Sequence, residues 1–61
     1  MLFVSAAIAL AEIAGFKAEV SGDRLHVWKN GEPISFSTLI TDGMISEMQF
    51  KQFIREYGFQ G

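Results

Sequence analysis

An alternating stretch followed by Asn30-Gly31 is the feature that most constrains how this 61-residue chain folds. From Arg24 to Lys29, polar and apolar side chains alternate with a period of two, which is typical of a strand with one buried face. An Asn-Gly pair after such a run is the strongest short-range signal for a hairpin. The stretch therefore predicts a central strand with Leu25 and Val27 toward the core and Arg24, His26 and Trp28 facing outward.

A two-residue loop at Asn30-Gly31 also predicts how the next strand, residues 34–37, pairs with the central one. It sets Lys29 opposite Glu32. The expected core pairs are Val27 with Ile34 and Leu25 with Phe36, and the outer pairs are Trp28 with Pro33, His26 with Ser35, and Arg24 with Ser37. Because proline has no amide hydrogen, we expect this third strand to lie at an edge of the sheet.

The first strand is predicted over residues 16–20, where Phe16, Ala18 and Val20 share the inward face. A turn at residues 21–23 joins it to the central strand. Two pairings of this strand with the central strand keep the apolar side chains of both on the core face. In one, Glu19 lies opposite Arg24, and in the other it lies opposite His26. Either register places a carboxylate beside a cationic or protonatable side chain on the outer face.

Residues 1–14 are almost wholly apolar and predict a helix that ends at Gly15. The run is too short to cross a bilayer and has no basic segment before it, so a helix is favoured over a signal peptide, and processing of the N-terminus is the less favoured alternative. The predicted inward stripe is Phe3, Ala6, Leu10 and Ile13, with Val4, Ile8 and Ala11 on the other side. That second side is either simply exposed or covered by another chain.

The last helix is predicted to begin after Ser46, because Ser46 and Gln49 have the spacing of a capping box and Ile45 is spaced to pack on Phe50. A start capped by Asp42 is the alternative. The apolar face of this helix comprises Phe50, Phe53, Ile54 and Tyr57. Gly58 followed by Phe59, spaced to touch Ile54, predicts a left-handed glycine ending.

Together these elements predict one small α+β domain over residues 1–61, with a three-stranded antiparallel sheet and two helices packed on one of its faces. The chain is 49% hydrophobic with six Phe, more than so small an interior can hide. It has one His and no Cys, which excludes a structural zinc site and fits a reducing cytoplasm. A net charge of −2 disfavours a nucleic-acid partner. We expect no cofactor, no metal and no membrane association.

The outer sheet face is the strongest candidate site, because its residues lie on a surface that no helix is expected to cover. His26 is the one side chain suited to proton transfer near neutral pH, but covering an open sheet face is the commoner use of His and Trp, so no catalytic residue is assigned. The candidate binding residues are Lys17, Arg24, His26, Trp28, Ser35 and Ser37. The candidate residues of an oligomer interface are Val4, Ile8, Ala11, Met44 and Met48.

The order of these elements resembles the HicA-type toxin family. The resemblance spans residues 8–59: a helix ending in Gly15-Phe16, a strand, a glycine turn, a histidine-bearing central strand, a third strand, and a helix ending in Gly58-Phe59. It implies a double-stranded-RNA-binding-like fold and cleavage of mRNA by a histidine on the second strand. The family's Gly-Ser-His motif corresponds to Gly22-Asp23-Arg24 here, so His26 is the residue that stands in for its histidine.

Two functions follow from these observations. The favoured hypothesis is a non-enzymatic module or regulator that binds an unidentified protein partner, including a second copy of itself. The alternative is a HicA-like module that binds or cleaves RNA through the open sheet face around His26.

Overall fold

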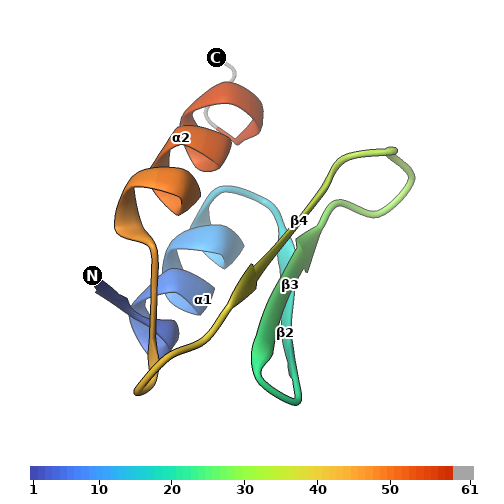
Figure 1. The fold of residues 1–61 in the computed structure, drawn as a ribbon. Helices are drawn as coiled ribbons and strands as arrows, with labels where there is room; N and C mark the ends of the chain where they lie inside the picture. The colour runs from blue at the N-terminus through green and yellow to red at the C-terminus, as the bar shows by residue number, and fades with distance from the viewer. Residues whose placement is uncertain (59–61) are drawn as a thin grey trace.

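The structure, a computed structural model, describes residues 1–58 and shows the predicted α+β arrangement in the order α-β-β-β-α (Figure 1). Both helices lie on the same side of a three-stranded antiparallel sheet with the order β2-β3-β4, and a small second sheet pairs β1 with β5. The elements are β1 (Leu2–Phe3), α1 (Val4–Ile13), β2 (Lys17–Ser21), β3 (Arg24–Trp28), β4 (Ser35–Leu39), β5 (Met44–Ile45) and α2 (Glu47–Tyr57).

The first hairpin adopts one of the two predicted registers, with Glu19 opposite His26. Its turn consists of Gly22 and Asp23, closed by the pair Ser21 and Arg24. Gly22 has a φ of +61°, a conformation that glycine adopts without the steric penalty other residues incur. This short turn sets the register that places the carboxylate of Glu19 next to the imidazole.

The second hairpin has a different register from the predicted one, displaced by two residues. β3 pairs with β4 so that Val27 lies opposite Phe36 and Leu25 opposite Thr38. The turn at Asn30-Gly31 does form, since the Glu32 amide donates to the Lys29 carbonyl at 3.3 Å. However, only Gly31, the second of the two central residues, has a positive φ, and a turn of this type II kind splays the strands.

Pairing therefore resumes only at Trp28 and Ser35, and Ile34 precedes β4 instead of belonging to it. Because side chains alternate between the two faces, a register displaced by two residues leaves each side chain of β4 on the face that was predicted for it. β4 is an edge strand, as Pro33 predicted.

A turn of the type predicted for Asn30-Gly31 occurs instead at Asp42-Gly43. Both residues have positive φ, +55° and +73°, and the amides and carbonyls of Thr41 and Met44 bond to each other across the turn. Asp42 is therefore a turn residue, and the alternative helix start at Asp42 is wrong. The turn aligns β5 with β1, which pairs Phe3 with Met44 and delays the start of α1 to Val4.

α1 is rotated relative to the predicted orientation. Ala7 and Ala11 are fully buried, whereas Ile13 is 75% exposed and Phe3, just before the helix, is 60% exposed. The helix is apolar nearly all round, so its periodicity does not distinguish one side from another. Short alanine side chains let the helix approach the sheet most closely, and this face is the one that packs. The helix ends at Gly15, which has a φ of +91° as predicted.

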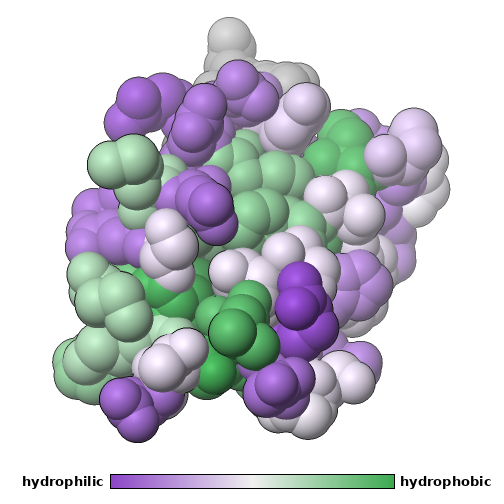
Figure 2. All heavy atoms as spheres, in the orientation of Figure 1, coloured by the Kyte–Doolittle hydropathy of each residue, from purple (hydrophilic) through white to green (hydrophobic). Residues whose placement is uncertain are grey.

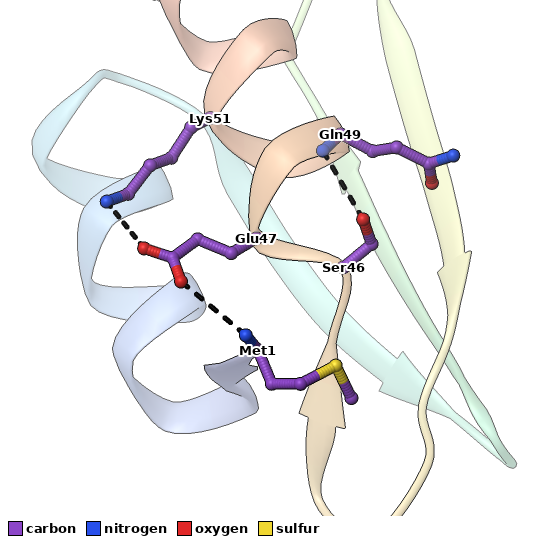
Figure 3. Close-up of polar contacts among 5 residues, drawn as sticks. All are labelled: Met1, Ser46, Glu47, Gln49 and Lys51. Carbon is purple, nitrogen blue, oxygen red and sulfur yellow. Dashed lines mark hydrogen bonds and ion pairs between the residues drawn. The ribbon is translucent and has the colours of Figure 1, made fainter.

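α2 begins at the predicted residue. Ser46 is the N-cap, and its hydroxyl accepts a hydrogen bond from the Gln49 amide at 3.4 Å (Figure 3). The predicted face packs inward: Phe50 is fully buried, and Phe53 stacks on Phe36 of β4 with ring centroids 5.1 Å apart. The contacts of the Phe50 and Phe53 rings therefore hold α2 against the sheet.

The end of α2 differs from the prediction. Gly58 has a φ of −98°, so it is right-handed and not the left-handed residue that was expected. A Cβ at this position would lie 2.9 Å from the Ala14 Cβ and 3.1 Å from the Phe16 Cε2. Glycine is therefore required for close packing of the end of α2 against the segment after α1. The predicted contact of Phe59 lies outside the described residues.

Candidate functional site

The sheet face opposite the helices carries all six predicted binding residues, and we call it the open face. Alternation along β2, β3 and β4 places every second side chain there, and of these Trp28 is the least exposed. The open face comprises Lys17, Glu19 and Ser21 of β2, Arg24, His26 and Trp28 of β3, and Ser35, Ser37 and Leu39 of β4.

The open face is centred on a pair of aromatic rings. The His26 and Trp28 rings, two residues apart on β3, lie with centroids 5.1 Å apart and planes inclined by 33°. Because the second hairpin is displaced, Ser37 lies opposite His26 and Ser35 lies opposite Trp28. The predicted direct pairs of His26 with Ser35 and of Arg24 with Ser37 are wrong.

Charged side chains flank these rings on β2 and at the start of β3 itself. Lys17 lies opposite Trp28, and Glu19 lies opposite His26. Arg24 still reaches Ser37 diagonally, because its Nε donates a hydrogen bond to the Ser37 Oγ at 3.0 Å. The arrangement provides an aromatic shelf with one cation on each side, which suits stacking of a planar ring and contact with an anion.

A second candidate surface lies at the end of the molecule where β1 and β5 pair. Met48, in the first turn of α2, is 80% exposed, and Phe3 lies opposite the partly buried Met44. Met1 and Met48 also line a hollow of about 510 Å³. We call Met1, Phe3, Met44 and Met48 the methionine surface. Figure 2 shows apolar side chains gathered at the lower left of the view, around the N-terminal end of α1.

Polar groups border the methionine surface. Glu47 accepts from the Lys51 Nζ at 2.7 Å, and the Met1 backbone nitrogen lies 3.6 Å from its other carboxylate oxygen (Figure 3). The hydrogen bond and positive charge of Lys51 lower the pKa of the Glu47 carboxyl below its ordinary value. An apolar centre with a charged rim is the usual anatomy of a protein interface.

A smaller hollow lies between the two helices. Its volume is about 240 Å³, and it is lined by Leu10 of α1 and by Phe50, Lys51, Ile54 and Arg55 of α2. Leu10 was predicted to face the core; it is partly buried and lies at the side of α1 next to α2.

The structure divides the five predicted interface residues into two groups. Met44 pairs with Phe3, and Met48 lines the hollow with Met1, so both belong to the methionine surface. By contrast, Ala11 is fully buried in the core and Val4 and Ile8 pack partly buried against it, so these three side chains face the chain's own interior. The rotation of α1 causes this difference. The exposed apolar residues that the sequence analysis placed inward include Phe3 and Ile13 of the predicted helix stripe and Val20 of the first strand, which is 47% exposed.

Within residues 1–58 the acidic and histidine side chains form no cluster that could hold a metal ion. None of the described helices combines the length and apolar character needed to cross a membrane. Comparison of the chain with known protein families, curated proteins and solved structures finds no match.

Proposed function

We propose that the protein is a small non-enzymatic module or regulator that acts by protein–protein contact and also self-associates. The observation that carries this proposal is the methionine surface, where Met48 is 80% exposed and lines a hollow with Met1, and Phe3 is 60% exposed. Contiguous exposed apolar side chains with a polar rim mark interaction sites in soluble domains.

Methionine suits such a surface for a physical reason. Its unbranched side chain and polarizable sulfur adjust to differently shaped partner surfaces. Met44 and Met48 also project from a rigid base, because Ile45 between them is fully buried in the core. The partner is an unidentified protein, and we place the module in the cytoplasm because its cysteine-free composition fits a reducing compartment.

The test replaces Met48 by Asp and compares it with the same change at Gln52, which lies one turn further along α2 and is also exposed. Each protein is used as bait in a pull-down read by mass spectrometry. We expect Met48→Asp to lose protein partners that the parent and Gln52→Asp retain. A parent that captures nothing specific, or equal capture by all three proteins, would contradict the proposal.

A second candidate is the HicA-like module that binds or cleaves RNA through the open face around His26. The observation that favours it is the contact between the His26 and Trp28 rings, with Lys17 and Arg24 on either side. Aromatic side chains flanked by cations bind single-stranded bases by stacking and contact phosphates by charge.

This candidate is tested by RNA retention on a filter and by toxicity on expression. His26→Ala and Trp28→Ala are expected to abolish both while circular dichroism shows a folded protein, because both side chains lie outside the core. Ser21→Ala, on the same face at the far edge, serves as the control. A parent with neither RNA binding nor toxicity would rule this candidate out.

A further inference from the structure

The outer edge of β4 carries backbone hydrogen-bonding groups that have no partner among residues 1–58. The Ile40 amide donates to the Asp23 carbonyl at 2.6 Å, so Asp23 and Ile40 form a hydrogen-bonded pair that continues the β3–β4 ladder. Hydrogen-bonded and non-bonded pairs alternate in an antiparallel ladder, so Phe36 and Thr38 direct their backbone groups to β3. The amides and carbonyls of Ser35, Ser37 and Leu39 therefore point away from the sheet. In Figure 1, β4 is the sheet strand nearest the viewer, with no helix over its outer edge.

The two edge strands of the sheet, β2 and β4, differ in how well their residues protect them from pairing with another chain. Natural edge strands avoid pairing with other chains by carrying charged residues, proline or a bulge. β2 carries Lys17 and Glu19, and pairing two copies about Glu19 would set like charges opposite each other. β4 carries no charged residue and no proline over its five residues, Ser35–Leu39.

We propose that the β4 edge binds the β4 edge of a second copy of this chain, in antiparallel register centred on Ser37. This inference rests on the self-association part of the proposed function and assigns it to a surface other than the methionine surface. The second copy is the occupant because its edge is equally uncharged and presents the same free backbone groups.

The centred register uses all five residues of both strands and joins the two sheets into one. On the open face, Ser37 lies opposite Ser37 of the second copy, and Leu39, which is 52% exposed, lies opposite Ser35. On the inner face, Phe36 lies opposite Thr38 of the second copy. The inner pair covers part of Phe36, which its own chain leaves partly exposed.

Engineered cysteines provide a direct test, since the chain has none of its own. Facing residues of a hydrogen-bonded antiparallel pair have Cα atoms about 5.5 Å apart, within the range that a disulfide bridges. We expect Ser37→Cys to form a covalent dimer under oxidised glutathione. Ser21→Cys, on the same face at the β2 edge, and Met48→Cys are expected to stay monomeric, as read by non-reducing electrophoresis.

A charge at the centre tests the same register without a covalent bond. Ser37→Lys places two ammonium groups opposite each other, and we expect it to weaken self-association about fivefold, as like charges across strands do. Ser21→Lys is the control, because Ser21 also neighbours Arg24 and lies at the other edge. Sedimentation velocity measures the change, and circular dichroism verifies the fold.

The outcomes separate this inference from the proposed function. If Met48→Cys cross-links and Ser37→Cys does not, self-association uses the methionine surface and the β4 assignment is wrong. If Ser37→Cys cross-links while Met48→Asp keeps every partner, the β4 assignment is supported and the methionine surface is refuted. A strictly monomeric parent, together with a Ser37→Cys variant that never cross-links, overturns the pairing of β4 with a second copy.

Discussion

Replacement of Lys29 by Met tests how the long hairpin is held against α2. The Lys29 Nζ donates a hydrogen bond to the carbonyl of Tyr57 at 3.1 Å and lies 4.9 Å from the centre of the Phe16 ring. Tyr57 is the last residue of α2, where the helix dipole is negative. One ammonium group therefore joins the end of β3, the C-terminus of α2 and the residue before β2. Methionine keeps most of the aliphatic stem and removes only the charge and the donor.

The expected loss follows from the two contacts. A cation at an exposed helix C-terminus is worth about 0.3–1 kcal/mol, and an exposed cation–π contact is worth about 0.5–1 kcal/mol. Together they amount to about 1–2 kcal/mol. For a domain of about this size each kcal/mol shifts Tm by about 4–8 °C, so we expect Lys29→Met to lower Tm by about 5 °C or more.

Thermal unfolding followed by circular dichroism measures this change, with Lys17→Met as the matched control. Lys17 is exposed on the open face, so its replacement is expected to leave Tm within about 2 °C, as surface substitutions usually do. Added salt should narrow the difference between Lys29→Met and the parent, because it screens the dipole interaction. Equal Tm values for the two variants would refute the docking role of Lys29.

Two further predictions follow from the helix ends. Because Lys51 lowers the pKa of Glu47, the ionised carboxylate stabilises the fold at neutral pH, and this contribution is lost as pH falls through the lowered pKa. In urea titrations, Glu47→Gln should therefore be less stable than the parent at pH 7, and this difference should shrink as pH falls through the lowered pKa; a difference that stays constant into the acid range would contradict this. At Gly58, alanine would meet Ala14 and Phe16 at 2.9 and 3.1 Å and should cost about 1–3 kcal/mol. A stabilising Gly58→Ala, as expected of an unhindered helix end, would show that the close approach is absent.

Local patterns determined much of the fold. Period-two alternation identified β2, β3 and β4 and the face each side chain takes, and a helical period with a capping serine located the start of α2. These signals are local, since each depends on residues a few positions apart. The shared face of the six candidate binding residues was predictable for the same reason: parity alone decides which sheet face they occupy.

The register and the packing depended on tertiary structure. Asn30-Gly31 and Asp42-Gly43 are equivalent turn signals in sequence, yet only Asp42 and Gly43 both adopt positive φ. The choice depends on whether the flanking strands pair there, which involves β1 at the other end of the chain.

The orientation of α1 is the second feature that the sequence left open. An apolar helix has no preferred side by itself, and the side that packs is the one whose alanines, Ala7 and Ala11, fit closest to the sheet. In this orientation Phe3 is exposed and Ala11 is buried. The candidate protein-binding surface is therefore the methionine surface and not the side of α1 that carries Ala11. Sequence alone therefore determined which residues share the open face, whereas long-range packing decided which strand edge and which apolar side chains remain free to bind.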